Sequence, residues 1–196
     1  MSEIDEISED LGVSLADRET NEKTPYVDIE LIKGDITQFE VDAVVNAAHD
    51  DLTGGGGVDG AIHKASGQKL LGECLNLYGC LQGEARITGA YNMPSKYIIH
   101  TVGPVWANTA FSEEKKTILG ECYKSCLLLA DLQGLKSIAF PCISTGAYCF
   151  PKDIAAEVSI NSIKNFFNSH CMTYIDLVQI VCFDEQNFEE YEKLLS

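Results

Sequence analysis

Four consecutive glycines, Gly54–Gly57, constrain the fold of this chain more than any other feature. They follow the apolar run Ala43–Asn46, which is typical of a short buried strand, and they precede Val58–Ser66, whose pattern predicts a helix. A glycine run is costly in backbone entropy, so it indicates a special geometry, such as close approach of the backbone to a ligand. Free N–H groups at the following helix start can also bind an anion. The segment is therefore predicted to be a phosphate-binding loop, with a flexible surface turn as the alternative.

This loop matches neither of two common nucleotide-binding motifs. No Gly-Lys-Ser/Thr follows it, as a Walker loop requires, and the G-x-G-x-x-G spacing is absent. A second loop of the same kind, Ile143–Tyr148, follows the predicted strand Ser137–Pro141. Ligands of open parallel sheets bind beyond the carboxyl ends of the strands. The two loops are predicted to hold the two phosphates of one pyrophosphate, provided that they lie at the same sheet edge.

Apolar runs alternate with amphipathic stretches along the rest of the chain. This alternation predicts a three-layer α/β/α fold, with a mixed, mainly parallel sheet between helices. Besides the segments above, the expected strands are Val27–Ile32, Ala85–Ala90, Tyr97–Val102 and Tyr174–Phe183, and the expected helices are Gln68–Tyr78, Glu113–Leu132, Ile154–Phe167 and Asn187–Leu195.

The first 22 residues differ in composition from the rest. They carry eight acidic residues and one basic residue, Arg18, and almost no aromatic side chains. Such a segment buries too little apolar area to offset its ordering entropy, so residues 1–22 are predicted to be a flexible tail. A short helix over Ile4–Leu15 is the alternative. The folded domain is expected to cover residues 23–196.

Charge and hydropathy exclude several classes of protein. The net charge of −16 argues against a partner such as duplex nucleic acid, which binds basic surfaces. No run approaches the ~18 apolar residues of a membrane-spanning helix, and the acidic N-terminus does not look like a targeting signal. We expect a soluble monomer in the cytoplasm or nucleus.

The eight cysteines form no CxxC pair, and the four histidines show no zinc-finger spacing with them. Without a secretory signal, reduced and mostly buried thiols are expected, and no metal site.

Several motifs resemble one known family. In chain order they are LIKGDIT, VDAVVNAA, GGGGVDGAIH, YIIHTVGPVW and ISTGAYCFP. The chain is identified as a macrodomain, similar to the MacroD-type ADP-ribosyl hydrolases, from about Tyr26 to the C-terminus. The resemblance implies that the ligand is ADP-ribose, bound as substrate or product without a further cofactor.

The resemblance also implies where each part of ADP-ribose binds. Asp35 would accept a hydrogen bond from the adenine amino group, with Ile36 beside it and Phe183 packing on the ring; a turn cap and core burial are the alternatives for Asp35 and Phe183. Asn46 would lie near the distal ribose. The two loops would contact the remaining parts of ADP-ribose. For Tyr148, a position in the hydrophobic core is the alternative. Their predicted binding residues are Gly54, Gly55, Gly56, Gly57, Val58, Ser144, Thr145, Gly146, Ala147 and Tyr148.

The predicted catalytic residues follow the predicted strand Ala43–Asn46. Asp59 matches the aspartate proposed to orient or activate the attacking water, and His63, four residues later, shares its helix face. The alternatives are a stabilising helix-start acid for Asp59 and a structural hydrogen bond for His63. MacroD-type enzymes usually read Asn-Ala-Ala-Asn where this chain has Asn46-Ala47-Ala48-His49. His49 thus replaces an amide that helps to place the water, and it can preserve, retune or abolish activity.

Three functions follow from these features. The leading hypothesis is an enzyme that removes mono-ADP-ribose from proteins modified on Asp or Glu and that also deacetylates O-acetyl-ADP-ribose. The second is a reader module that binds ADP-ribose without hydrolysing it, which the histidine at position 49 favours. The third is a thiol or redox enzyme that uses Cys142 or Cys149 beside the second loop.

Overall fold

The computed structural model describes residues 27–107, 111–170 and 173–196. The predicted tail over residues 1–22, with its alternative helix, lies outside them, as does Cys171. Within the described residues, no helix has the length and apolar character needed to cross a bilayer.

A six-stranded sheet forms the centre of the molecule, with the strand order β1-β6-β5-β2-β4-β3. Five strands are parallel, and β3 pairs antiparallel with β4 at one edge. The strands are β1 (Asp28–Lys33), β2 (Ala43–Ala47), β3 (Ala85–Gly89), β4 (Tyr97–Thr101), β5 (Ser137–Pro141) and β6 (Leu177–Cys182). The predicted mixed, mainly parallel sheet is confirmed.

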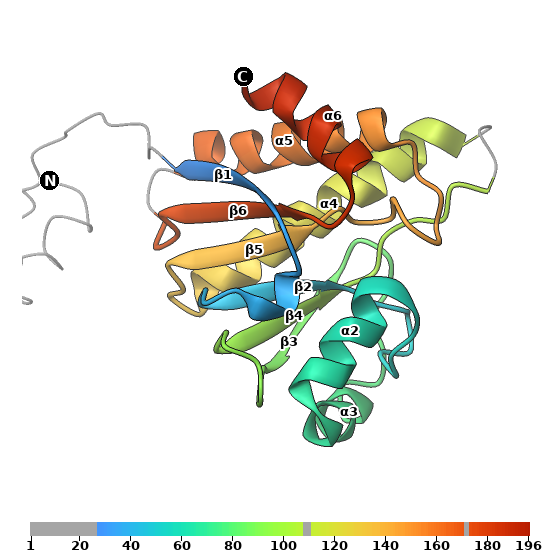
Figure 1. Ribbon diagram of the computed structural model, residues 1–196, viewed down its shortest axis with the longest axis vertical. Helices are drawn as coiled ribbons and strands as arrows, with labels where there is room; N and C mark the ends of the chain where they lie inside the picture. Colours follow the sequence, from blue (N-terminus) through green and yellow to red (C-terminus); the bar gives the residue numbers. More distant parts are fainter. Residues whose placement is uncertain (1–26, 108–110, 171–172) are drawn as a thin grey trace, which may run out of the picture.

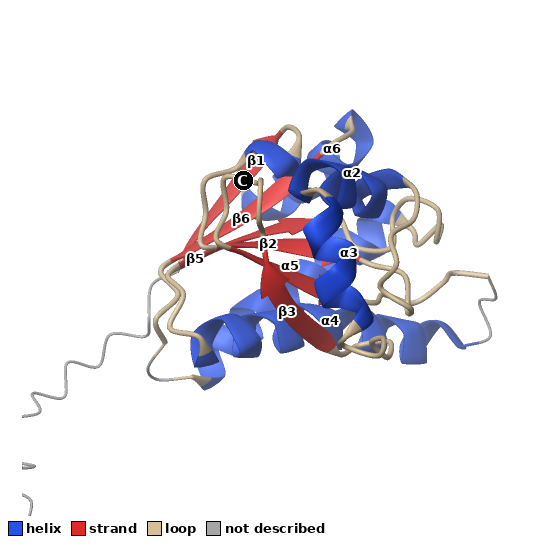
Figure 2. Ribbon diagram, turned by 90° about the horizontal axis from the view of Figure 1, so that it is seen from below, coloured by secondary structure: helices blue, strands red, loops and turns tan. Residues whose placement is uncertain are grey.

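Helices cover both faces of the sheet (Figures 1 and 2). One face packs against α4 (Ser112–Leu132) and α5 (Lys152–Ser169), and the other against α2 (Gly57–Ser66) and α3 (Gln68–Leu75). A final helix, α6 (Glu185–Leu195), joins α5 through a hydrogen bond from Ser159 Oγ to Tyr191 OH at 2.8 Å. The three-layer α/β/α prediction is therefore confirmed. A three-residue 3₁₀ turn, η2 (Ile36–Gln38), follows β1.

The central strand β2 shows why the sheet is enclosed. Val44 and Val45 point to opposite faces and both are fully buried, Val44 against the α2–α3 layer and Val45 against the α4–α5 layer. A continuous apolar run is what a strand covered on both faces requires. Because five strands run in the same direction, the segments that follow them begin at one edge of the sheet, and the candidate site lies there.

Two elements are shorter than expected by three residues or more, and the strands β3 and β4 each end one residue early. The helix predicted over Gln68–Tyr78 ends at Leu75, because Tyr78 and Gly79 adopt left-handed φ values of 56° and 87° that break the helical path. The last strand spans Leu177–Cys182 rather than Tyr174–Phe183.

Candidate active site

A cavity of about 320 Å³ opens at the carboxyl edge of the sheet. It lies between the segments that follow β2 and β5, which are neighbouring strands. The condition for a shared phosphate site, two loops at one edge, is therefore met. The cavity is lined by Ala47, Ala48, His49, Gly55, Gly56, Gly57, Val58, Asp59, Gly103, Cys142, Ser144, Gly146, Ala147 and Tyr148.

The glycine loop takes a shape that side chains would disturb. Gly54 has a φ of 90° and lies against the His63 ring, where a Cβ would come within 3.1 Å of that ring. Gly57, with a φ of 59°, begins α2. Gly60, one turn further on, packs directly against the carbonyl of Gly55, so any Cβ there would overlap that oxygen. The alternative of an unconstrained surface turn is not supported.

Asp59 is held in one orientation at the start of α2. Its side chain is buried, and its Oδ1 accepts a hydrogen bond from Asn46 Nδ2 at 2.7 Å. Its Oδ2 has no hydrogen-bond partner and faces Gly55 at the cavity wall. A buried carboxylate oxygen without a partner is costly, so Oδ2 is the oxygen of Asp59 that still lacks a hydrogen-bond donor.

A histidine on the next strand fixes the Asn46 amide from behind. The Nδ2 of Asn46 also lies 3.1 Å from His100 Nδ1, and His100 Nε2 lies 2.9 Å from Thr88 Oγ1. Burial, with a smaller contribution from His63, lowers the pKa of His100 to about 3, so its ring is neutral at pH 7. Because an amide nitrogen only donates, Nδ1 of His100 accepts and its Nε2–H donates to Thr88. Both hydrogens of Asn46 are thus used, and its buried Oδ1 has no partner.

His63 lies on the same helix face as Asp59, as its spacing predicts. Its Nε2 is 3.5 Å from Asp59 Oδ1, and this nitrogen has no hydrogen-bond partner. The alternative of a structural hydrogen bond is therefore not borne out. A catalytic or orienting role for His63 stays a prediction.

Backbone hydrogen bonds hold the second loop, from within its own segment and from the segment after β4. Phe150 N donates to Ser144 O at 3.0 Å, and Trp106 N donates to Tyr148 O at 2.8 Å. Ser144 is buried with a φ of 66°, and its Oγ lacks a partner. Thr145 does not line the cavity, and its hydroxyl donates to Cys142 O at 2.9 Å.

Tyr148 is half-buried at the cavity wall, so a core position for it is wrong. Burial, together with the carboxylates of Asp50, Asp59 and Asp51, raises its pKa. Both effects favour the neutral, protonated phenol.

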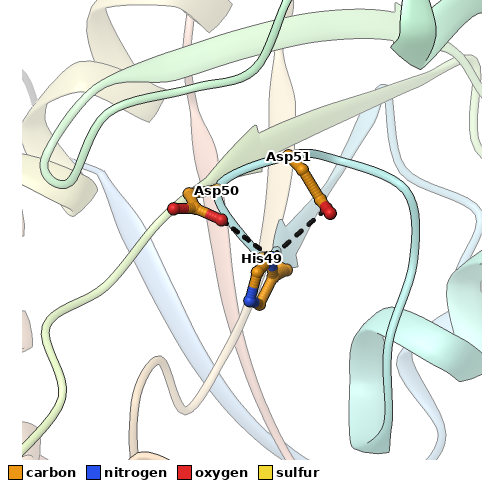
Figure 3. Close-up of side chains that lie close together, drawn as sticks. All are labelled: His49, Asp50 and Asp51. Carbon is orange, nitrogen blue, oxygen red and sulfur yellow. Dashed lines mark ion pairs between the residues drawn. The ribbon is translucent and has the colours of Figure 1, made fainter.

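His49 lines the cavity, and its ring nitrogen Nδ1 contacts the two aspartates that follow it in the chain. Nδ1 lies 2.8 Å from Asp50 Oδ1 and 3.2 Å from Asp51 Oδ1, and all three side chains are exposed (Figure 3). Their ligand atoms lie within 4.8 Å of one another, a spacing that suits a cation, although exposed acidic groups commonly gather without one. The sequence did not indicate this cluster.

The residues predicted to bind adenine follow the neighbouring strands β1 and β6, on one side of the sheet, and do not line the cavity. Asp35 is exposed, and its Oδ1 accepts from both Thr37 N and Thr37 Oγ1, so the turn-cap alternative is realised. Ile36 is buried in the core. Phe183 is 84% exposed, which rules out core burial and leaves its ring open to a ligand. The adenine roles stay predictions.

Three cavity residues, Ala47, Ala48 and Gly103, were missed by sequence reasoning, and a fourth, Cys142, was predicted only as a thiol nucleophile. The first two directly follow Asn46, and the other two follow β4 and β5, so position at a strand end was the available signal. The seven described cysteines are free, and five are buried. Contact with Cys182, whose sulfur lies 3.4 Å away, and burial raise the pKa of the Cys142 thiol. A protonated thiol is a poor nucleophile, which disfavours Cys142 in the thiol-enzyme hypothesis, whereas the role of the exposed Cys149 stays a prediction.

A three-layer α/β/α fold with two such loops at one edge of its sheet defines a class of ligand-binding domain, and comparison with known proteins gives its family. The chain belongs to the macrodomain family: the Macro domain model matches residues 45–159. It is 48% identical over 168 residues to the ADP-ribose glycohydrolase MACROD2 of Xenopus laevis, a match that covers 86% of this chain and only 40% of that protein. It is 46% identical over 175 residues to O-acetyl-ADP-ribose deacetylase 1 of Pantoea vagans, which covers 86% of this chain and 98% of that protein.

A solved structure agrees with this assignment. The macrodomain of Trypanosoma brucei in complex with ADP-ribose matches with a TM-score of 0.80 and 39% identity, over 89% of this chain and 72% of that one. The resemblance to the MacroD-type branch is thereby confirmed.

Proposed function

We propose that this chain is an ADP-ribosyl hydrolase that removes mono-ADP-ribose from aspartate- or glutamate-modified proteins and also deacetylates O-acetyl-ADP-ribose. One observation carries the proposal. Asp59 is buried with Oδ1 bound to Asn46 and with Oδ2 facing the glycine loop of a cavity that two phosphate-type loops enclose. The names of the relatives, a glycohydrolase and a deacetylase, agree with it.

In this proposal the chain binds ADP-ribose mainly through its backbone. Amides of the loops at 54–57 and 144–148 surround the diphosphate, and these amides give a local positive potential despite the net charge of −16. Small residues at the loops allow the close approach that such contacts need. Asp35 and Phe183, which follow β1 and β6, are assigned to the adenine.

Asp59 is assigned to the attacking water. Its Oδ2 accepts a proton of that water and orients the oxygen towards the distal ribose, while Asn46 and His100 keep the carboxylate from rotating. The bond that breaks joins C1″ of the ribose to an acyl oxygen, and a carboxylate is a good leaving group. The reaction therefore needs neither a strong acid nor a metal ion.

A reader module is the second candidate, and one observation favours it. His49 stands where MacroD-type enzymes carry an asparagine, and its Nδ1 contacts Asp50 and Asp51. Because these contacts hold the His49 ring, it contributes less to placing a water beside Asp59.

Turnover separates the two candidates. The wild-type chain, mixed with a protein that carries mono-ADP-ribose on glutamate, is expected to release free ADP-ribose, and O-acetyl-ADP-ribose is expected to yield acetate. Binding of ADP-ribose without release from either substrate would leave the reader. We further propose that the modified proteins are cytoplasmic or nuclear and that the chain acts as a monomer.

A further inference from the structure

A second hollow adjoins the active-site cavity, on the side of His49. This groove has a volume of about 450 Å³ and lies between the segment after β2 and the segment after α3. It is lined by Asp50, Asp51, Thr53, Leu75, Tyr78, Gly79, Cys80 and Leu81.

Three large apolar side chains on this groove are unusually exposed: Leu75 at 57%, Tyr78 at 95% and Leu81 at 71%. Single exposed apolar residues are common, but a group of them around a hollow marks a contact surface. Tyrosine in particular is enriched at positions that contribute strongly to binding, because it brings a large rigid area and a polar tip.

The groove is preformed rather than built from loose loops. Cys80 N donates to Asp50 O at 2.9 Å, which ties the two walls together. Gly79 has a φ of 87° and packs so closely on Asp50 that a Cβ would come within 2.8 Å of its carbonyl oxygen. Leu52, between the two aspartates and Thr53, is fully buried and anchors the first wall. Little ordering entropy remains to oppose binding there.

The linings of the catalytic cavity and the groove meet along the chain at the cluster in Figure 3. His49 lines the cavity, while Asp50 and Asp51, 2.8 and 3.2 Å from its Nδ1, line the groove. An extended chain that leaves the distal ribose past His49 therefore meets the groove within a few residues, since each residue spans about 3.3 Å.

The charge of the groove defines its occupant. Its lining contains two exposed carboxylates and no lysine or arginine. We propose that this groove binds the polypeptide of the ADP-ribosylated substrate beside the modified side chain, and that it selects an apolar residue flanked by lysine or arginine. Opposite charges across such a rim raise association rates and select partners. The inference rests on the proposed hydrolase function, because it names the class of protein on which that site acts.

Matched substrates test the proposal. Two peptides carry ADP-ribose on glutamate: one has a neighbouring leucine between lysines, and the other has serine between glutamates. O-acetyl-ADP-ribose, which lacks a polypeptide, is the third substrate. The basic apolar peptide is expected to have a kcat/KM about tenfold above that of the acidic peptide, and the difference is expected to shrink at high salt.

Two surface substitutions locate the effect. In the variant Tyr78→Asn with Leu81→Ser, asparagine suits the left-handed φ at position 78, so the backbone is retained. This variant is expected to lose about tenfold in kcat/KM on the basic apolar peptide, with no change on O-acetyl-ADP-ribose. Leu132→Ser is the matched control, because Leu132 is 80% exposed at the end of α4, away from the groove.

Each outcome decides the proposal. Equal turnover of the two peptides, or equal losses in the groove variant and the Leu132→Ser control, would overturn it. A loss of the same size on O-acetyl-ADP-ribose would place the effect in the cavity and overturn it as well. If no substrate is hydrolysed, the proposed function fails, and the affinities of the two modified peptides still decide the groove: equal values reject it, and tighter binding of the basic apolar peptide supports it.

Discussion

The packing of Gly60 against Gly55 gives a prediction whose size follows from the structure. In Gly60→Ala, the new Cβ would lie under 3.0 Å from the Gly55 carbonyl oxygen. To regain ordinary van der Waals contact, that carbonyl must move by ~1 Å. Gly55 is the loop residue that faces Asp59 Oδ2, so the space for the attacking water changes by a similar amount. A misplacement of this size costs roughly 10²-fold in rate, and we expect turnover to fall by about that factor.

The assay is release of ADP-ribose from a glutamate-linked protein, with thermal unfolding measured in parallel. Gly72→Ala is the matched control: Gly72 lies on the exposed side of α3, and a Cβ there meets nothing within 4 Å. That variant is expected to keep wild-type turnover and to gain about 0.5–1 kcal/mol of stability, since alanine favours helix more than glycine does. If Gly60→Ala is as active as Gly72→Ala, the glycine loop does not position the reaction.

Three further predictions concern single side chains. Asp35→Ala is expected to weaken ADP-ribose binding by about 1–3 kcal/mol, measured by calorimetry, through loss of a charge-assisted hydrogen bond; unchanged affinity would remove Asp35 from the adenine site. His49→Asn is expected to raise turnover, because the shorter amide is freed from Asp50 and Asp51; a fall would show that the imidazole takes part in the chemistry. The pKa of His100 is about 3 in the folded protein against an ordinary value of 6.5, so the unfolded chain binds a proton there first as the pH falls. His100 therefore contributes stability above pH 6.5 that is lost between pH 6.5 and 3, with a slope of up to about 1.4 kcal/mol per pH unit. Urea unfolding of His100→Asn should show a correspondingly flatter pH profile than wild type, and parallel profiles would contradict the buried neutral ring.

The parts of the fold that sequence could predict are those with local causes. Gly54–Gly57 between an apolar run and a helix indicated the first loop, and the alternation of runs indicated a mainly parallel sheet. The end of α3 was misplaced because left-handed residues at Tyr78 and Gly79 stop the helix, and Tyr78 gives no local sign of such a conformation. The antiparallel pairing of β3 with β4 likewise depends on tertiary packing.

The candidate site, too, has a part that the sequence could predict and a part that it could not. Asp59 and His63 could be placed on one helix face because their spacing is helical. The contacts of Asn46 with Asp59 and with His100, 13 and 54 residues away, could not be predicted, because the packing of α2 on β2 and the pairing of β2 with β4 bring these side chains together. His49 lines the cavity and contacts Asp50 and Asp51, which line the groove. The sequence places these three residues side by side but does not indicate that their side chains meet.

The assignment of the attacking water to Asp59 is the central claim, and one paired measurement on Asp59→Asn tests it most directly. Asparagine keeps the size of the side chain and removes the carboxylate, so turnover of the glutamate-linked substrate is predicted to fall roughly 10²-fold or more. ADP-ribose affinity, measured by calorimetry on the same preparation, is predicted to change far less, because both phosphate loops remain. Turnover at the wild-type level in Asp59→Asn, or affinity lost in proportion to turnover, would contradict the account.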